Sequence, residues 1–158
     1  MPCTVRHIPS TSTHALRRRV LRDGRPDAEV VFAGDDDATT LHFGAFKEHA
    51  DTPAAIASLY PAPLKDQSQS GGVPADRQYQ FRGMASASEV RGQGFADAVM
   101  RAMIDHVRAQ HANGAPCLLW CNARMVAVGF YERFAMRVVS PQFDIAGVGP
   151  HVVMTVTL

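Results

Sequence analysis

The chain lacks a strong charge of either sign and lacks any long apolar run. Its 158 residues carry 16 Lys and Arg against 15 Asp and Glu, a formal net charge of +1. This balance produces no broad field, so we expect neither nucleic acid nor a membrane surface as a partner. No apolar run approaches the roughly 20 residues that span a bilayer. The N-terminus also lacks the apolar region of a signal peptide, and we therefore expect a cytoplasmic location.

Cysteine is scarce and odd in number. Cys3, Cys117 and Cys121 cannot form a disulfide framework, and no secretory signal accompanies them. Cys117 and Cys121 fall on one face of a predicted strand, which makes them a poor zinc half-site. We expect buried free thiols and no metal centre.

The remaining composition is that of an ordinary globular chain, with 46% hydrophobic and 20% charged residues. The length suits one domain over residues 1–158. Hydrophobic periodicity predicts an α/β chain in the order β-α-β-β-β-α-β-α-β-β. The strands are predicted at 4–8, 39–48, 54–60, 79–86, 117–121, 138–145 and 152–158. The helices are predicted from Ser10 or Ser12 to about 22, at 93–111 and at 124–134.

The helical patterns also predict which side chains face inward. The central helix carries Phe95, Val99, Met103 and Val107 at four-residue intervals. The last helix is expected to bury Val126, Phe130 and Phe134. The first helix carries Arg17, Arg18, Arg19 and Arg22, a run most typical of a solvated face. Residues 61–78 are rich in Pro, Ser, Gln and Gly and are predicted to form a mobile loop.

Residues Arg91–Ala96 form a glycine-rich turn between a predicted strand and a predicted helix. Gly92 and Gly94 allow a ligand to approach the main chain closely, and a helix N-terminus presents unpaired N–H groups. A P-loop is excluded because Gly94 is followed by Phe95 and Ala96 rather than Lys and Ser or Thr. A dinucleotide fingerprint would need a third glycine and a later acidic residue, which are absent. An ordinary turn is the alternative.

The Arg-x-x-Gly-x-Ala spacing of this turn resembles the acetyl-coenzyme A signature of the GNAT acetyltransferase superfamily. The element order resembles the family too, as do Asn122 after the fifth strand and Phe130-Tyr131 on the next helix. The resemblance implies a mostly antiparallel sheet of about seven strands flanked by helices. The chain departs from the family at Ala135-Met136, where Gly-Phe is usual, so that turn is expected to differ. The short second helix of the family is also not evident in residues 25–38.

What the resemblance implies is an N-acetyltransferase that moves an acetyl group from acetyl-coenzyme A to a primary amine of a small molecule or peptide. The pyrophosphate would be held by main-chain N–H groups of Arg91, Gly92, Gln93, Gly94, Phe95 and Ala96. The pantetheine arm would lie beside Met84, Ala85 and Ser86. Gly83 is consistent with a bulge or a close approach in that strand.

The resemblance also implies the catalytic residues. Tyr131 would be the general acid that protonates the leaving thiolate, or else an amphipathic core tyrosine. Asn122 would bond the pantetheine or a water, or cap the following helix. The base is left open. Glu89 would accept the amine proton through waters, and His42 and Glu48 are the other candidates, but each of the three is more typical of an ordinary surface or core residue. Arg91 would add charge at the phosphates, or else pair with Glu89.

Two other functions compete with the enzyme. A non-catalytic acyl-coenzyme A-binding module would keep Arg91–Ala96 but would not need Tyr131. A structural partner domain would use the glycines only as a turn. The sequence does not name the acceptor amine, and exposed strands near the C-terminus are compatible with a homodimer.

Overall fold

The computed structural model describes residues 3–111 and 113–158. The chain forms two compact units, one made of the residues up to Tyr60 with Phe81–His106, the other of Pro61–Gln80 and Val107–Leu158. The predicted order of strands and helices is confirmed, with the sixth predicted strand divided in two.

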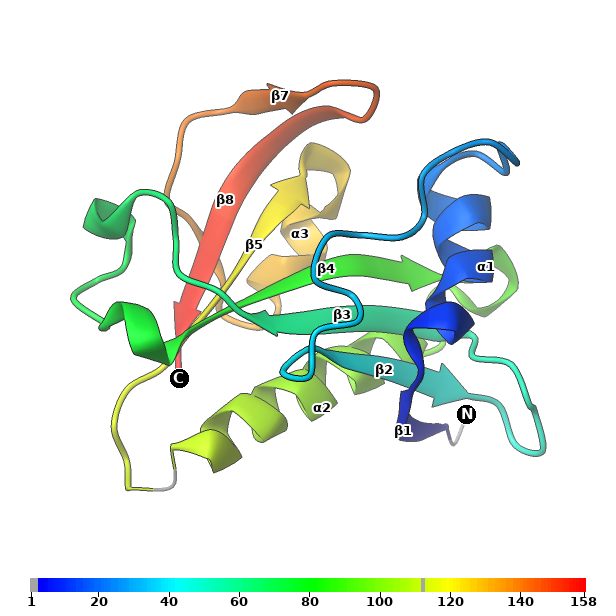
Figure 1. Cartoon of the computed structure of the whole chain (residues 1–158), viewed down its shortest axis with the longest axis horizontal. Helices are drawn as coiled ribbons and strands as arrows, with labels where there is room; N and C mark the ends of the chain where they lie inside the picture. The colour runs from blue at the N-terminus through cyan, green and yellow to red at the C-terminus, as the bar shows by residue number, and fades with distance from the viewer. Residues whose placement is uncertain (1–2, 112) are drawn as a thin grey trace. The chain divides into compact units, whose positions relative to one another are not determined.

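The first unit contains an antiparallel sheet of β1 (Thr4–Ile8), β2 (Leu41–Phe46) and β3 (Ala55–Pro61). Thr4 pairs with Phe46, and Leu41 pairs with Leu59. The next strand in the sheet order is β4 (Gln78–Ser86), most of which belongs to this unit. The second and third strands are therefore antiparallel neighbours (Figure 1).

The second unit contains β5 (Leu118–Arg124), β6 (Arg137–Val138), β7 (Phe143–Ile145) and β8 (Gly149–Thr157). β8 pairs antiparallel with each of the other three. The first residues of β4 pair parallel to β5, with Gln78 opposite Leu118. The sheet is thus mixed and mostly antiparallel, as expected. The predicted 138–145 strand is split because Pro141 lacks the N–H that a ladder needs.

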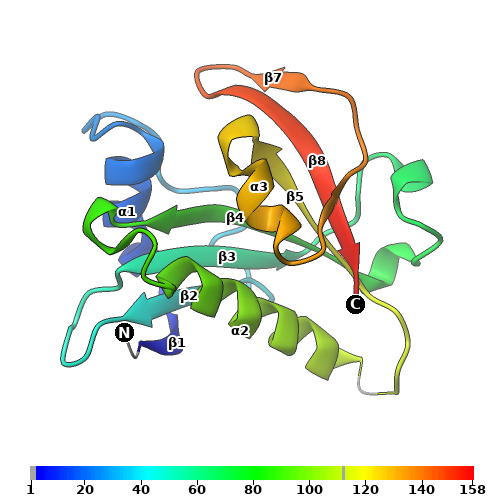
Figure 2. The same cartoon turned by 180° about the vertical axis from the view of Figure 1, so that it is seen from behind.

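The long helix α2 (Phe95–Gln110) has the predicted inward face, since its four periodic residues are each at most 1% exposed. Its first three turns and the helical segment at α1 (His14–Leu16) lie on opposite faces of β2 and β3. Figure 1 draws α1 in front of these strands, and Figure 2 draws α2 in front. Both faces of this part of the sheet are therefore covered.

The helical segment at α1 differs from the prediction. It begins as a 3₁₀ turn (Ser10–Thr13), and it ends as a π-helical turn (Arg17–Leu21). Neither predicted serine caps it with its side chain. The prediction that the arginines form a solvated face is wrong for Arg17, which is completely buried. The change of helix type alters which side chains point inward.

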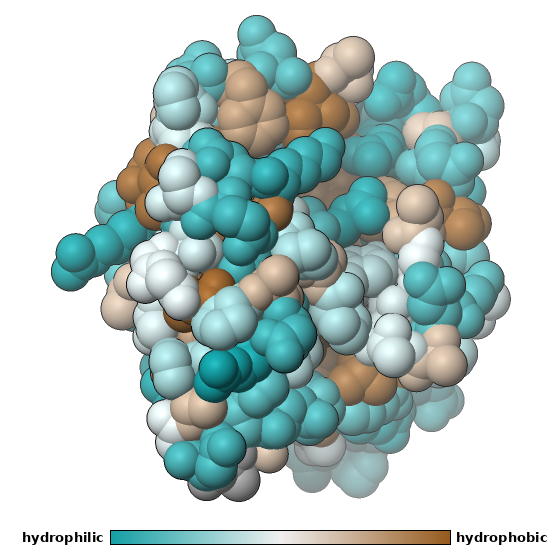
Figure 3. All heavy atoms as spheres, turned by 60° about the vertical axis from the view of Figure 1, so that its left-hand side comes forward, coloured by the Kyte–Doolittle hydropathy of each residue, from teal (hydrophilic) through white to brown (hydrophobic). Residues whose placement is uncertain are grey.

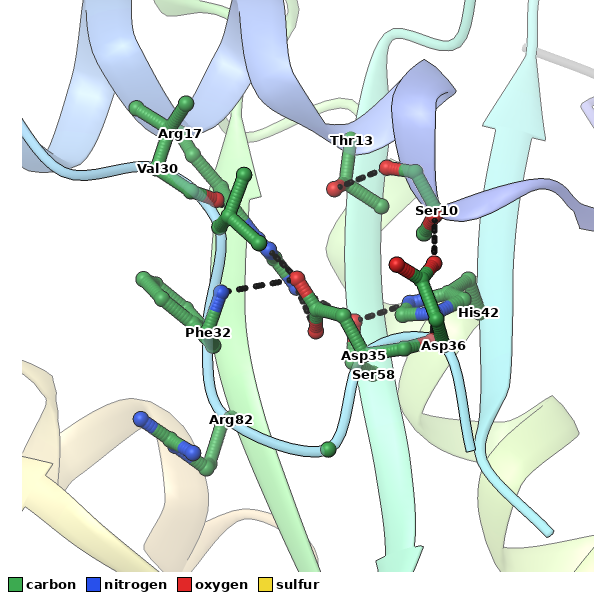
Figure 4. Close-up of polar contacts among 12 residues, drawn as sticks. Ser10, Thr13, Arg17, Val30, Phe32, Asp35, Asp36, His42, Ser58 and Arg82 are labelled. Carbon is green, nitrogen blue, oxygen red and sulfur yellow. Dashed lines mark hydrogen bonds and ion pairs between the residues drawn. The ribbon is translucent and has the colours of Figure 1, made fainter. Parts of the chain in front are cut away.

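The Arg17 guanidinium is paired inside the first unit (Figure 4). It forms a two-pronged ion pair with Asp35, and it also donates to the Val30 carbonyl at 2.7 Å and to Ser58 Oγ at 2.9 Å. Tyr60 Oη donates to the same carboxylate at 2.7 Å. An arginine cannot lose its proton in a protein, so burying one requires these acceptors.

His42 belongs to the same network. Its Nε2 lies 2.8 Å from the Asp35 carbonyl and its Nδ1 lies 2.6 Å from Ser58 Oγ. A carbonyl can only accept, so Nε2 carries the proton and Nδ1 accepts from the Ser58 hydroxyl. Both ring nitrogens are engaged in hydrogen bonds of the core. His42 therefore has no lone pair with which to take a proton from a substrate amine.

The last predicted helix is shorter than expected. A 3₁₀ turn (Met125–Ala127) leads into α3 (Val128–Glu132). Val126 is 94% exposed and Phe130 and Phe134 are half-buried, so the predicted inward stripe is wrong. Tyr131 is the buried residue instead. The 3₁₀ turn has fewer residues per turn than an α-helix, and this shifts the inward face.

The turn after α3 keeps the left-handed conformation despite its alanine. Ala135 has φ +62°, and Ala135 N–H donates to the Glu132 carbonyl at 3.1 Å. We expected this turn to differ from the glycine turn that is usual in the family. Its main chain nevertheless has the left-handed conformation that glycine would adopt. Alanine pays roughly 1–2 kcal/mol for this conformation, and the burial of Met136 directly after it offsets the cost.

Residues 61–78 carry more internal structure than the predicted loop. They contain 3₁₀ turns at Gln67–Gln69 and Ala75–Arg77. Leu64 and Val73 are buried in a cluster with Leu118 and Trp120. The Gln78 side chain is also buried, where it accepts from Leu64 N–H and donates to the Val73 carbonyl. Its amide thus ties both ends of the segment together.

The exposed surface is mixed in character. On the face in Figure 3, hydrophilic residues predominate and hydrophobic residues form small, separate patches. Among the described residues, no helix combines the length and apolarity needed to cross a membrane.

The buried ion pair predicts a pH-dependent contribution to stability. Burial alone would raise the pKa of Asp35, but hydrogen bonds from Arg17, Tyr60 and the Phe32 N–H outweigh burial and lower it from 3.8 to about 2. A lowered pKa gives stability that is complete above pH 3.8 and is lost as pH falls through 2. We expect about 2 kcal/mol of unfolding free energy to disappear over this range.

The variant Asp35→Asn should lose about 3–5 kcal/mol at neutral pH, because it leaves a buried guanidinium unpaired. The adjacent Asp36→Asn is the matched control, since exposed Asp36 accepts only from Ser10 Oγ. It should cost under about 0.5 kcal/mol. Urea titrations between pH 2 and 7 measure both effects; equal stability of the two variants would contradict the role given to Asp35.

Candidate functional site

The glycine turn lies in the first unit between the end of β4 and the start of α2. A 3₁₀ turn (Ser88–Val90) leads into it. Gly92 has φ +75° and Gly94 has φ +87°, values that L side chains rarely adopt. A Cβ built on either glycine would meet nothing within 4 Å. The turn therefore needs glycine for its main-chain shape and leaves the space beside both residues open.

Several main-chain N–H groups of the turn have no partner among the described residues. Gln93 N–H donates to the Val90 carbonyl at 3.1 Å, and Arg91 N–H donates to the Ser88 carbonyl at 3.4 Å. The first bond of α2 runs from Ala98 N–H to the Gly94 carbonyl. The N–H groups left over belong to Gly92, Gly94, Phe95 and Ala96. Unpaired N–H groups at the N-terminus of a long helix favour an anion.

Arg91 and Glu89 do not form the ion pair that was one alternative for Arg91. Glu89 binds Arg19 at 2.7 Å rather than Arg91, and both partners are more than half exposed. The exposed side chain of Arg91 has no hydrogen bond or ion pair with the described residues. A hydrogen bond to its own main-chain N–H, and then the bond from Arg19, lower the pKa of Glu89. Its carboxylate is consequently a weaker proton acceptor.

The end of β4 contains a break in regular strand geometry. Gly83 has φ +66°, and a Cβ there would lie 3.1 Å from the Phe32 ring and 3.2 Å from Arg17 Nε. The close approach that was considered for Gly83 is therefore confirmed, and its positive φ interrupts the regular strand. The predicted pantetheine residues follow directly, with Ala85 buried and Met84 and Ser86 half-buried.

The second unit contains the other two predicted site residues. Asn122 lies within β5 opposite Val153, and its side chain is exposed. The alternative that it caps the next helix does not hold, because Arg124 is the residue that precedes the 3₁₀ turn. Tyr131 is 7% exposed, and its ring lies edge-on to Phe130 at 5.3 Å between centroids. Burial, and then the neighbouring Cys121, raise the pKa of Tyr131, so its phenol stays protonated.

The structure also groups residues that the sequence did not single out. Arg17 and Arg82 lie over the Phe32 ring, next to Gly83. Asp35 binds Arg17, and Tyr60 Oη donates to Asp35. Their separation along the chain, from residue 17 to residue 82, leaves no local signal. In the described part of the chain, no three His, Cys, Asp or Glu side chains are placed to hold a metal ion.

Comparison with known proteins identifies the family. The family model described as "Acetyltransferase (GNAT) family" matches residues 11–136. The chain belongs to the GNAT acetyltransferase family. The predicted family is thereby confirmed, and the protein is an acyltransferase.

Individual members of the family are similar over nearly the whole chain. The chain is 30% identical over 154 residues to "Uncharacterized N-acetyltransferase YitI" of Bacillus subtilis (strain 168), covering 98% of this chain and 95% of that protein. A GCN5-related N-acetyltransferase from Kribbella flavida has the same fold, with a TM-score of 0.69 at 18% identity, covering 99% and 98% of the chains. An aminoglycoside 6'-N-acetyltransferase complexed with coenzyme A gives a TM-score of 0.69 at 10% identity, covering 98% and 96%.

The glycine turn yields a prediction that separates binding from folding. Any side chain at Gly94 is strained by its positive φ, so a loss of stability alone would not reveal a ligand site. Gly147 is a matched control, because it has φ +73° and equally open surroundings in the β7–β8 turn. We expect Gly94→Ala and Gly147→Ala to lower the melting temperature to a similar extent.

Only Gly94→Ala should weaken coenzyme A binding, by about 10- to 100-fold, because a methyl group enters the space beside the free N–H groups. Calorimetric titration of both variants below their melting temperatures measures this. Equal affinities for the two folded variants would show that the turn has only a structural role.

Proposed function

We propose that the protein transfers an acetyl group from acetyl-coenzyme A to the primary amine of a small molecule or peptide. Members of this family use acyl-coenzyme A, and a fold neighbour is described as complexed with coenzyme A. The observation that carries the proposal is the open turn before α2, with two glycines at positive φ and four free N–H groups.

The turn would bind the pyrophosphate. The N–H groups of Gly92, Gly94, Phe95 and Ala96 can donate to phosphate oxygens, and the dipole of the 16-residue helix α2 adds a favourable field. Arg91 and Gln93 use their N–H groups within the turn, so their contribution would come from side chains. The Arg91 guanidinium is exposed and available for this.

The end of β4 would bind the pantetheine arm and the thioester. Regular strand geometry is interrupted at Gly83, and main-chain groups of Met84, Ala85 and Ser86 beyond it would bond the arm. Asn122 would supply a side-chain amide to the same arm or to a water. Asn122 is exposed on β5, and Arg124 rather than Asn122 is the N-cap of the following 3₁₀ turn. Both observations support a role in binding over a role as a helix cap.

Tyr131 would act as the general acid. The acid must be protonated before the thiolate leaves, and the raised pKa of the buried phenol keeps it so. Glu89 would receive the proton of the amine through waters. Its lowered pKa makes it a weak base, so its role would be to pass the proton to solvent rather than to hold it.

Ligand selectivity tests the proposal directly. We expect calorimetric binding of acetyl-coenzyme A and no measurable binding of ATP or NAD at the same concentrations, since the turn lacks the P-loop lysine. Tight ATP binding without a coenzyme A signal would overturn the proposal. Binding without turnover on a broad amine panel, followed by thiol release, would instead favour a non-catalytic acyl-coenzyme A sensor.

Tyr131→Phe tests the proposed acid. We expect a fall in kcat of about 10²- to 10⁴-fold with unchanged coenzyme A affinity, because the ring is kept and only the hydroxyl is removed. Tyr79→Phe is the control: the Tyr79 hydroxyl bonds to His111 at 2.9 Å and has no proposed catalytic part. Stopped-flow thiol release compares the two. A Tyr131→Phe enzyme as fast as Tyr79→Phe, with chemistry rate-limiting, would remove Tyr131 from this role.

A further inference from the structure

We propose that the acceptor is a free amino acid, and that Arg82 binds its carboxylate while its amine is acetylated. This inference rests on the proposed acetyltransferase function and names the substrate class for it. It makes Arg82 a specificity-determining residue of the first unit.

Arg82 is a half-buried cation without an acidic partner among the described residues. Its one hydrogen bond is a long contact of 3.4 Å to the Ala33 carbonyl. Its guanidinium otherwise lies over the rings of Phe32, at 4.8 Å, and Tyr60, at 5.6 Å. In Figure 4 the Arg82 side chain points away from Asp35. A guanidinium held between aromatic rings keeps its fork of N–H donors pre-organised for a carboxylate.

The Asp35 carboxylate, which lies beside Arg17, is already occupied. It accepts from Arg17, from Tyr60 Oη and from Phe32 N–H at 2.8 Å. Asp35 consequently has no capacity left to neutralise Arg82.

The local charge is therefore positive, although the whole chain is nearly neutral. Arg17 and Arg82 place their guanidinium carbons 3.9 Å and 4.8 Å from the centre of the Phe32 ring. The Asp35 carboxylate is paired with Arg17, so it offsets that charge and leaves the charge of Arg82. Guanidinium groups stay charged at any physiological pH, so the excess is permanent and favours an anionic ligand.

The buried part of the same cluster also contains an unsatisfied donor. Arg17 Nε is buried and has no hydrogen-bond partner among the described residues. It lies 3.2 Å from the position that a Cβ on Gly83 would take, and the Phe32 ring lies 3.1 Å from that position, so the space beside Gly83 is narrow. A buried N–H without an acceptor is costly, and it adds to the positive character of this region.

The spacing along β4 sets the size of the acceptor. Arg82 precedes Met84 by two residues, which span at most about 7 Å of chain. Met84–Ser86 is where the thioester is proposed to lie. A carboxylate on Arg82 and an amine near Met84 can belong to one molecule only when a few bonds separate them. This geometry fits free α-, β- or γ-amino acids better than a polyamine.

The test compares free amino acids with their carboxamides, which keep the amine and remove the negative charge. We expect wild-type kcat/KM to favour the carboxylate of at least one matched pair by about 10- to 100-fold, the range of a charge-assisted hydrogen bond. Arg82→Gln should reduce this preference to near unity, and Arg82→Lys should keep part of it. Arg108→Gln, an exposed arginine of α2, should change nothing.

Coenzyme A titration accompanies each variant so that two failures stay distinguishable. Absent coenzyme A binding overturns the proposed function itself. Normal coenzyme A binding overturns only the present inference if carboxamides react as well as amino acids, if Arg82→Gln keeps the wild-type preference, or if no amino acid in the panel is acetylated. Unchanged coenzyme A affinity in Arg82→Gln, with the preference lost, supports it.

Discussion

The buried guanidinium of Arg17 constrains the first unit more than any other group. It cannot be neutralised, so folding must supply acceptors on several sides at once. Val30 and Asp35 provide them from the long connection before β2, and Ser58 provides one from β3. The same charge requires a residue without a side chain at Gly83, because a Cβ there would crowd Nε. The burial of Arg17 thus constrains the connection before β2, the strand β3 and the main chain at Gly83 together.

This network also shows where the sequence was informative and where it was not. The strands of both units and the inward face of α2 follow from local hydrophobic patterns, and they were predicted within a few residues. The burial of Arg17 follows from Asp35, which is 18 residues away, and from Ser58, which is 41 away. A run of arginines predicts a solvated face when only the local sequence is considered. Tertiary structure is needed to show that one of them is paired in the core.

The error at α3 has a different cause. Val126, Phe130 and Phe134 have a helical spacing, but the chain enters the helix through a 3₁₀ turn and Tyr131 takes the inward position instead. The glycine turn was more predictable because glycine adopts a positive φ readily, as Gly92 and Gly94 do. Which N–H groups remain free was not predictable, since that depends on the carbonyls of Ser88 and Val90.

Net charge shows why composition was a poor guide to the acceptor. A total of +1 correctly gives no reason to expect a broad field, yet charge acts on a small ligand over a few ångströms. Within that range the ligand meets the guanidinium groups around Phe32 and a carboxylate that is already saturated. The ion pair with Arg17 consumes the acidic group that would otherwise neutralise Arg82. The bonds to Asp35 that allow Arg17 to be buried leave Arg82 without an acidic partner. In the proposed mechanism, stability and selectivity for the acceptor are therefore coupled through Asp35.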